Sequence, residues 1–468
     1  MSTLEQGIKD DVSWLEPLSI ESLLQDAKPD PGRVKEILAK ARMFHGLTPE
    51  EVAVLIRVEE PALLDELFHT AKEVKEEIYG KRIVLFAPLY ISNVCKNECL
   101  YCAFRASNMD LVRRTLSYDE IAAETRSMIR TGQKRIVMLL GEAYPAEGFD
   151  YFLNAIRTVY ETKEGPGEIR RINVEIAPLS VEDFRRLKAA EIGTYITFQE
   201  TYHRPTYEQV HMAGKKKDFE WRLGCMDRAM EAGIDDVGLG VLFGLADWRF
   251  ELLAIMQHAK HLEDRFGCGP HTISVPRIEP ALGSDLSMRP PHAVSDADFK
   301  KIIAIIRLAV PYTGMILSTR ENAEIRRDCL QLGISQISAG SRTDPGGYES
   351  KDHTNAQFCL GDHRSLDEVV RDLAAMGFIP SFCTACYRMG RTGQDFMDLA
   401  KPGDIKEHCN PNAISTFMEY LLDYASPETQ AAGSKLVEEL LSGMDSSHRE
   451  FTADLIRQVK EGRRNVCI

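Results

Sequence analysis

Eight short apolar segments alternate with amphipathic helical segments between residues 82 and 338, and this alternation constrains the fold more than any other feature of the chain. It predicts a parallel sheet, and eight repeats fit a closed (β/α)8 barrel of the TIM type. Such barrels carry their working residues on the loops that follow the carboxyl ends of the strands. The expected strands are 83–86, 135–140, 172–176, 195–199, 236–241, 272–275, 315–318 and 335–338.

Helical signals lie on both sides of this barrel. Thr48-Pro49-Glu50-Glu51 combines an N-cap, a first-turn proline and a capping-box glutamate, which together predict a helix start. Asn410-Pro411 and Ser426-Pro427 predict the starts of two helices near the other end of the chain. We therefore expect an N-terminal helical segment, a barrel, and a mostly helical C-terminal cluster-binding domain, over residues 1–80, 81–377 and 378–468.

Charge and composition exclude several classes of partner. The chain of 468 residues has 57 Lys and Arg against 71 Asp and Glu, a net charge of −14, which argues against nucleic acid or an anionic membrane as a partner. No apolar run reaches about 18 residues, and the N-terminus lacks the basic and apolar regions of a signal peptide, so we expect a cytoplasmic protein. Eleven cysteines in such a chain indicate metal ligation or catalysis rather than disulfides.

Three of these cysteines, Cys95, Cys99 and Cys102, lie in the loop expected after the first strand. A closed zinc site usually takes four ligands, whereas three thiolates on one loop leave a metal position free for something other than protein. In a 4Fe-4S cluster, three thiolates would hold three irons and leave the fourth open. A zinc-binding loop is the alternative, although no fourth ligand lies nearby in the sequence.

A second group of three cysteines follows the eighth expected strand. Cys383 and Cys386 form a CxxC pair, and Cys409 follows after a further 22 residues. Taken alone, this group is also compatible with a zinc knuckle in which His408 is the fourth ligand. The remaining cysteines are scattered and are expected to be small buried side chains, with exposure at the tail as the alternative for the last of them: Cys225, Cys268, Cys329, Cys359 and Cys467.

The barrel rule places further polar residues at the mouth that holds the first cysteine group. Ser318-Thr319-Arg320 follows the seventh strand and Ser341-Arg342 the eighth, and two arginines with neighbouring hydroxyls suit the carboxylate of an amino acid. The alternative is a pair of helix caps or structural ion pairs. His271 opens the sixth strand and is therefore expected at the opposite end, where a lone histidine is normally structural.

The Cys-x3-Cys-x2-Cys loop, with Tyr101 before the third cysteine, resembles the radical S-adenosylmethionine (radical SAM) superfamily. In that superfamily the open iron of a 4Fe-4S cluster binds S-adenosylmethionine and reduces it to methionine and a 5'-deoxyadenosyl radical. The resemblance implies catalytic roles for Cys95, Cys99 and Cys102. Gly141-Glu142 resembles the Gly-Gly-Glu motif that binds the ammonium group of S-adenosylmethionine, although Leu140 replaces the first glycine. Four further residues are candidates for binding the ribose and carboxylate of S-adenosylmethionine: Glu175, Gln199, Glu200 and Arg204. Each could equally be a solvated loop residue.

The combination of this loop with CxxC-x22-C resembles the HydG family, radical SAM tyrosine lyases that take part in iron–iron hydrogenase maturation. The resemblance implies cleavage of the Cα–Cβ bond of L-tyrosine to p-cresol and dehydroglycine. Dehydroglycine is then converted to carbon monoxide and cyanide, which are captured on iron at a second, auxiliary iron–sulfur cluster. It also implies a labile extra iron there, for which His271 is a candidate ligand. The implied partners are tyrosine, an electron donor and other hydrogenase maturation proteins.

Two other functions remain open at this point. The 2-iminoacetate synthase of thiamine biosynthesis shares the barrel and the first cysteine motif but lacks the C-terminal motif. A zinc-binding interaction protein without enzymatic activity is the alternative from a different class. Iron and acid-labile sulfide contents distinguish these possibilities, since two clusters, one cluster and zinc without sulfide give different values.

Overall fold

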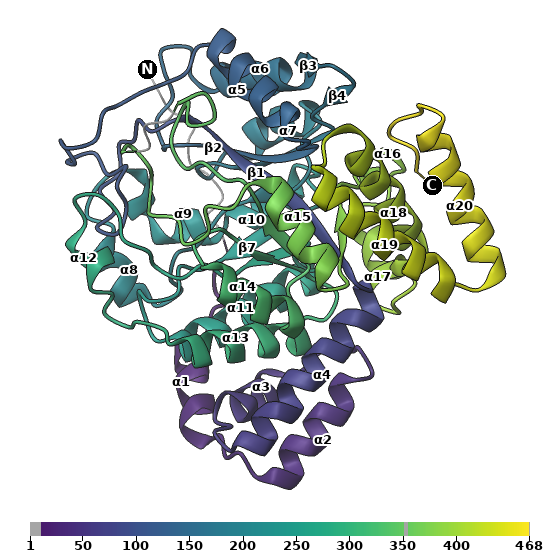
Figure 1. Ribbon diagram of the computed structural model, residues 1–468. Helices are drawn as coiled ribbons and strands as arrows, with labels where there is room; N and C mark the ends of the chain where they lie inside the picture. The colour runs from purple at the N-terminus through teal and green to yellow at the C-terminus, as the bar shows by residue number, and fades with distance from the viewer. Residues whose placement is uncertain (1–10, 351–353, 468) are drawn as a thin grey trace.

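The computed structural model describes residues 11–350 and 354–467. Eight parallel strands close into a barrel surrounded by helices, as the alternation in the sequence predicted (Figure 1). Each strand pairs with the next, and the last pairs with the first through Val84↔Gln336, Leu85↔Ile337 and Phe86↔Ser338. The barrel strands are β1 (Arg82–Ser92), β2 (Arg135–Leu140), β5 (Arg171–Glu175), β6 (Tyr195–Ile196), β7 (Val237–Gly240), β8 (Thr272–Ser274), β9 (Gly314–Leu317) and β10 (Gln336–Ser338).

The helices fall into three groups along the chain. Four precede the barrel and lie at the bottom of Figure 1: α1 (Pro17–Asp26), α2 (Pro31–Ala41), α3 (Pro49–Ile56) and α4 (Pro61–Tyr79). The barrel contributes α5 (Tyr118–Arg130), α6 (Phe149–Glu161), α7 (Val181–Ala189), α8 (Arg204–Val210), η1 (Lys215–Lys217), α9 (Phe219–Leu223), α10 (Cys225–Glu231), α11 (Trp248–Phe266), α12 (Asp285–Met288), α13 (Asp296–Ala309), α14 (Ala323–Leu332) and α15 (Leu366–Ala375). The last group is α16 (Ala385–Arg388), α17 (Gly393–Ala400), α18 (Ile405–Asp423), α19 (Pro427–Gly443) and α20 (Ser446–Lys460).

Two small elements were not expected from the sequence. A short antiparallel hairpin joins β3 (Lys163–Glu164) and β4 (Gly167–Glu168). More important for the site, β11 (Ile379–Ser381) adds a ninth strand that pairs in parallel with the start of β1, through Arg82↔Ile379 and Val84↔Ser381. This pairing attaches the chain beyond residue 377 to the N-terminal end of the barrel, so Cys383 emerges there. The division into three parts stays a prediction.

The expected helix starts are mostly confirmed. Thr48 accepts from the backbone N–H of Glu51 within a capping box, and Ser426 accepts from the N–H of Thr429. The start predicted at Asn410-Pro411 is wrong, because α18 already begins at Ile405 and contains Pro411. Ile405, Cys409 and Ala413 are buried at helical spacing, so packing of this face carries the helix through the proline.

The barrel strands are buried along almost their whole length, which is typical of a parallel sheet covered by helices. Among the described residues, no helix is long and apolar enough to span a membrane.

Two cysteine sites at opposite ends of one barrel

The loop after β1 brings its three cysteines to the C-terminal mouth of the barrel. Backbone hydrogen bonds join this loop to the segment that follows α8, with Met212 N donating to Glu98 O at 2.9 Å and Glu98 N to Ala213 O at 3.0 Å. Cys95, Cys99 and Cys102 line one cavity together with Gly141, Glu142, Glu175 and Glu200. All three are free thiols, and burial raises the pKa of each.

Gly141 lies where β2 meets this loop, and only glycine fits there. Its backbone N–H donates to Ser92 O at 2.8 Å, and a Cβ on Gly141 would lie 2.3 Å from the carbonyl oxygen of Val94. Because the obstructing atom belongs to the backbone, a side chain could be accommodated only by moving the cysteine loop. The glycine therefore keeps the cysteine loop packed close to the end of β2.

Glu142 is held as a carboxylate by two partners. Asn97 Nδ2 donates to its Oε2 at 2.6 Å, and Arg222 on α9 donates to its Oε1 at 3.0 Å. Burial alone would raise the pKa of Glu142, but the charges of Arg222 and Lys216 outweigh burial and lower it. A second pair in the same cavity joins Lys216 Nζ to Glu200 Oε1 at 2.5 Å.

Two of the candidates expected with Glu200 do not line this cavity. Arg204 begins α8 and projects toward solvent, with 45% of its side chain exposed, where it pairs with Glu220 at 3.3 Å. Gln199 is buried outside the cavity, and its Nε2 has no hydrogen-bond partner within residues 11–350 and 354–467. The cations of this cavity are instead Arg222 and Lys216, which sequence reasoning missed. The only signal for them was their position in the connection after the fourth strand.

A second cavity adjoins the first inside the barrel. Ser318, Thr319, Arg320 and Ser341 line it, as the sequence suggested, and its remaining wall is largely apolar and aromatic. Glu175 lines both cavities, and burial together with the charge of Glu200 raises its pKa to about 7. The apolar and aromatic wall residues are Phe86, Pro88, Tyr90, Val137, Leu139, Ile196, Phe198, Pro276, Ile316 and Phe358.

Only one of the two expected arginines enters the second cavity. Arg320 lines it, and no side chain in the described parts of the chain forms an ion pair with its guanidinium. Burial lowers the pKa of Arg320, and the nearby charges of Tyr90, Glu200, Glu175 and Glu279 offset only part of that effect. Arg342 lies outside the cavity, because its side chain turns back along its own loop and donates to Ser341 O at 2.9 Å.

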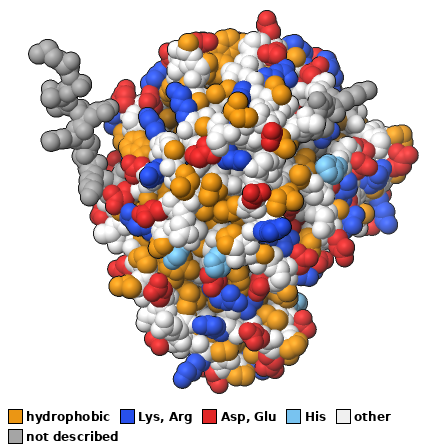
Figure 2. All heavy atoms as spheres, turned by 90° about the vertical axis from the view of Figure 1, so that its left-hand side faces the viewer, with side chains coloured by type: hydrophobic (Ala, Val, Ile, Leu, Met, Phe, Trp, Pro, Cys, Tyr) orange, Lys and Arg blue, Asp and Glu red, His pale blue; other side chains and the backbone are white. Residues whose placement is uncertain are grey.

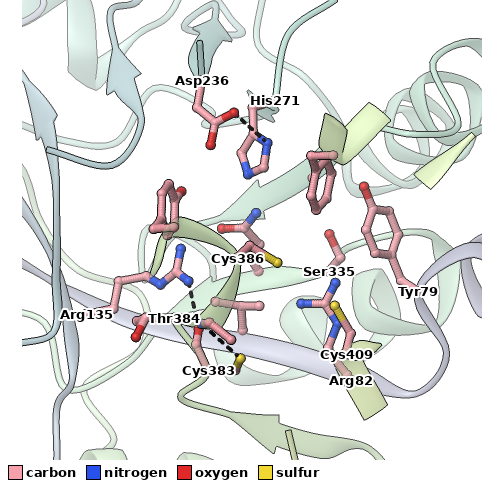
Figure 3. Close-up of a pocket in the computed structure, with 16 residues that line it drawn as sticks. Tyr79, Arg82, Arg135, Asp236, His271, Ser335, Cys383, Thr384, Cys386 and Cys409 are labelled. Atoms are coloured by element: carbon pink, nitrogen blue, oxygen red, sulfur yellow. Dashed lines mark hydrogen bonds and ion pairs between the residues drawn. The ribbon is translucent and has the colours of Figure 1, made fainter. Parts of the chain in front are cut away.

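At the opposite end of the barrel, the C-terminal cysteines share a third cavity with His271 (Figure 3). Cys383 follows β11, Cys386 lies on α16 and Cys409 on α18, while His271 directly precedes β8. His271 Nδ1 lies 3.4 Å from Asp236 Oδ1, and the centroids of the His271 and Phe396 rings lie 4.7 Å apart with the ring planes tilted by 59°. His408, the fourth ligand of the zinc-knuckle alternative, does not line this cavity.

Two arginines give the third cavity a positive lining. Arg82 projects beside Cys409 in Figure 3, and the negative charges that Cys409, Tyr79, Cys386 and Cys383 carry when ionised raise the pKa of Arg82 against the effect of burial. Arg135 donates to Cys383 O at 2.8 Å. The Nε atoms of both arginines are buried without a hydrogen-bond partner in the part of the chain that the structure describes.

These features fit an anionic group in the third cavity. A buried cation is costly unless an anion lies close to it, and thiolate-held iron–sulfur clusters are anionic. A hydrogen bond from Cys409 lowers the pKa of Cys386, and Arg82 acts in the same direction. Over residues 11–350 and 354–467, no group of three or more His, Cys, Asp or Glu side chains is arranged to hold a single metal ion.

Comparisons with known proteins agree with this architecture. Residues 89–256 match the Radical SAM superfamily and residues 274–379 match the Biotin and Thiamin Synthesis associated domain. The 2-iminoacetate synthase of Escherichia coli (strain K12) is 32% identical over 364 residues, which are 78% of this chain and 94% of that protein. A crystal structure of HydG, a maturase of the FeFe-hydrogenase, is 48% identical with a TM-score of 0.95, covering 98% of this chain and 100% of that one.

The chain belongs to the HydG family of radical SAM enzymes. HydG from Carboxydothermus hydrogenoformans agrees with this assignment at 40% identity and a TM-score of 0.83, covering 94% of this chain and 97% of that one. The match to HydG extends over nearly the whole chain, whereas about a fifth of the chain lies outside the match to 2-iminoacetate synthase.

Membership of the HydG family implies a 4Fe-4S cluster and S-adenosylmethionine as cofactors, and the first cavity fits both. Three thiols on one loop suit a cluster with an open iron. The ionised Glu142, which lines the same cavity, suits a ligand with an ammonium group. The assignment of individual residues to these ligands stays a prediction.

Proposed function

We propose that this protein is a radical SAM lyase that cleaves the Cα–Cβ bond of L-tyrosine at one end of its barrel and captures the resulting carbon monoxide and cyanide on iron at the other, for iron–iron hydrogenase maturation. One observation carries the proposal. A single barrel holds a three-cysteine cavity at each end, and the first adjoins an aromatic cavity whose arginine forms no ion pair with any described residue. The whole-chain similarity to HydG supports the same function.

At the first cavity, the chain's task is to hold the cluster and orient the cofactor. When bound, the cluster and S-adenosylmethionine supply the 5'-deoxyadenosyl radical that abstracts a hydrogen atom from tyrosine. Cys95, Cys99 and Cys102 hold the cluster, and Glu142 accepts hydrogen bonds from the ammonium group of the cofactor. Asn97 and Arg222 fix the orientation of Glu142. The enclosed barrel keeps water away from a reactive alkyl radical.

In the second cavity, Arg320 binds the carboxylate of tyrosine. Burying that carboxylate requires a charge-assisted partner, and Arg320 is a guanidinium with no ion pair among the described residues. The hydroxyls of Ser318 and Thr319 lie on the same wall. The ring of tyrosine packs against Phe86, Phe358 and the neighbouring apolar side chains, since an aromatic wall of this kind suits an aromatic ligand.

At the third cavity, Cys383, Cys386 and Cys409 hold an auxiliary iron–sulfur cluster. Arg82 and Arg135 stabilise its negative charge. His271 lies on the wall of the same cavity and is a candidate ligand of a labile extra iron, with Asp236 orienting its ring. Because the third cavity lies in the same barrel as the first, carbon monoxide and cyanide formed from dehydroglycine reach this iron without release into solution.

A 2-iminoacetate synthase is the second candidate function. The 32% identity to the Escherichia coli enzyme favours it, and both functions share the radical chemistry of the first cavity. They differ in the C-terminal cluster, so they are distinguished by that cluster and by its products.

The test replaces Cys386 or Cys409 by Ala in the full chain after anaerobic reconstitution, with Cys359→Ala as the control because Cys359 is exposed and lies outside both cysteine groups. The Cys386→Ala and Cys409→Ala variants are both expected to form 5'-deoxyadenosine and p-cresol from tyrosine, measured by chromatography. They are also expected to lack the infrared stretching bands of iron-bound carbon monoxide and cyanide. Bands that persist in both variants would contradict a capturing role for these cysteines. Loss of p-cresol in both would contradict separable sites.

The metal content of the unmodified protein provides an independent test. About eight or more irons per chain with matching sulfide are expected for two clusters. About four irons would favour the 2-iminoacetate synthase function, and zinc without sulfide would contradict both.

A further inference from the structure

Three exposed lysines lie together on the outer side of the first cysteine loop, and we call them the lysine ridge: Lys96, Lys215 and Lys217. Lys96 belongs to the loop itself, while the other two belong to η1. Gly214 joins the two segments closely, since a Cβ there would lie 2.7 Å from Lys96 O. Lys216 N also donates to Asn97 Oδ1 at 3.1 Å. The ridge is therefore attached directly to the backbone between Cys95 and Cys99.

The charges of the lysine ridge have no ion-pair partner among the residues that the structure describes. Within residues 11–350 and 354–467, none of its three ammonium groups forms an ion pair, whereas Lys216 between them points inward to Glu200. The adjacent carboxylate of Asp218 accepts from Trp221 N at 3.0 Å, as the N-cap of α9. Three unpaired like charges in a chain with a net charge of −14 form a local positive site that attracts an acidic partner.

Exposed apolar side chains lie around the same mouth. Asn108 on the cysteine loop donates to Leu282 O at 3.0 Å, so residues near 109 and 282 meet there. The exposed fractions are 90% for Met109, 53% for Met212, 42% for Leu282 and 62% for Met288. Figure 2 shows the face that carries α8, α9 and α12, where hydrophobic side chains lie among charged ones. Flexible methionines are typical of surfaces that adapt to a partner.

We infer that the lysine ridge and its methionine-rich surroundings are the docking surface for an acidic one-electron carrier protein that reduces the cluster held by Cys95, Cys99 and Cys102. In the step that docking enables, one electron leaves the carrier and enters the cluster, so the carrier is oxidised and the cluster reduced, and no covalent bond changes. Electron transfer slows steeply with distance. A carrier that binds on the outer side of the cysteine loop therefore comes close to the cluster that the loop holds.

The surface suits a transient complex. Three lysines with a small apolar area are typical of a weak redox interface, in which charge steers the encounter and fast release follows. Steering of this kind depends on ionic strength, because exposed charges are screened within about 8 Å at 0.15 M salt. This inference goes beyond the proposed function, since it depends only on reduction of the first cluster and not on the identity of the amino-acid substrate.

The test uses the full reconstituted chain with Lys215→Glu/Lys217→Glu and a matched control, Lys28→Glu/Lys35→Glu. The control lysines are exposed, lie among the N-terminal helices, and form no ion pair in the described residues. The probe is a purified acidic flavodoxin, and the readout is the stopped-flow rate constant for cluster reduction at low salt. A parallel assay reduces the same cluster with photoreduced 5-deazariboflavin, an uncharged small molecule.

The ridge variant is expected to lower the flavodoxin rate constant by about tenfold or more, within the range that electrostatic steering contributes. The control should change it by less than about twofold, and reduction by deazariboflavin should be the same in all three proteins. Raising the salt concentration should lower the rate constant for cluster reduction by flavodoxin in the unmodified protein but not in the ridge variant. An equal flavodoxin rate for the ridge variant and the unmodified protein would overturn the inference.

A neutral variant, Lys215→Gln/Lys217→Gln, covers the case in which charge reversal disturbs the loop. It is expected to give an intermediate flavodoxin rate with full reduction by deazariboflavin. A salt-independent flavodoxin rate in the unmodified protein would also overturn the inference. Failure of 5'-deoxyadenosine formation with deazariboflavin in the unmodified protein would instead count against the proposed function.

Discussion

The guanidinium carbon of Arg320 lies 3.3 Å from the centroid of the Phe358 ring. This contact holds the cation against an aromatic wall while leaving its hydrogen-bond donors to the cavity. Arg320 and Phe358 come from different connections of the barrel, the first after β9 and the second from the long loop after β10. The shape of the second cavity therefore depends on the path of that loop.

Replacing Arg320 by Lys should raise the tyrosine concentration needed for half-maximal p-cresol formation by about tenfold or more, since a charge-assisted hydrogen bond contributes about 1.5–3 kcal/mol. Binding of S-adenosylmethionine should change little. Arg342→Lys is the matched control, because Arg342 donates to Ser341 O outside the cavity and should leave the tyrosine requirement nearly unchanged. If both variants weaken tyrosine binding equally, the distinction between the two arginines is wrong.

Replacing any one of Cys95, Cys99 and Cys102 by Ala should abolish 5'-deoxyadenosine formation, because a cluster held by two thiolates no longer keeps a single open iron for the cofactor. The assay is chromatography of anaerobic reaction mixtures with a chemical reductant. Cys359→Ala should retain activity, since that cysteine is exposed and belongs to neither group. Normal turnover in any of the three loop variants would contradict the assignment.

Gly141→Ala should weaken binding of S-adenosylmethionine and destabilise the protein by about 1–3 kcal/mol, the usual effect of overpacking. The physical reason is the 2.3 Å approach of the new Cβ to Val94 O, which pushes the cysteine loop away from β2. Isothermal titration and thermal unfolding measure the two effects. Gly443→Ala, where a Cβ meets nothing within 4 Å, is the control and should be neutral or stabilising.

Arg82→Gln should lower the iron and sulfide retained at the C-terminal cluster after anaerobic reconstitution, because the variant removes a buried positive charge facing the three thiols. The N-terminal cluster should be unaffected, so 5'-deoxyadenosine formation serves as an internal check. The exposed neighbour Lys81 provides the control, and Lys81→Gln should keep the full metal content. Unchanged iron and sulfide in Arg82→Gln would show that the charge of Arg82 is not needed there.

Stability should fall as pH decreases from about 6.5, partly because of His258. Burial lowers the pKa of His258 to about 3, so below 6.5 the unfolded chain binds a proton that the folded chain does not. His258 packs 4.5 Å from Trp14 and hydrogen-bonds to Tyr202 OH at 2.7 Å. Denaturant unfolding of His258→Gln should therefore depend less on pH between about 5 and 6.5. His69→Gln, an exposed control, should follow the unmodified protein.

Local patterns in the sequence determined the barrel, because strand and helix periodicity and helix caps are encoded by residues that are neighbours in the chain. The eight expected strands and the helix starts at Thr48 and Ser426 follow from such signals. The cysteine spacings likewise indicated two metal centres, since the ligands of each loop lie close together in sequence. The position of the first loop at the barrel mouth followed from the strand that precedes it.

Tertiary structure alone decided which side chains meet in each cavity, because those contacts join residues far apart in the chain. Arg222 rather than Arg204 reaches Glu142, since Arg222 on α9 lines the cavity while the side chain of Arg204, at the start of α8, projects toward solvent. Arg320 enters the second cavity and Arg342 does not, because the side chain of Arg342 turns back along the loop after β10. The pairing of β11 with β1, which no local signal marks, brings the C-terminal cysteines into the cavity that also contains His271.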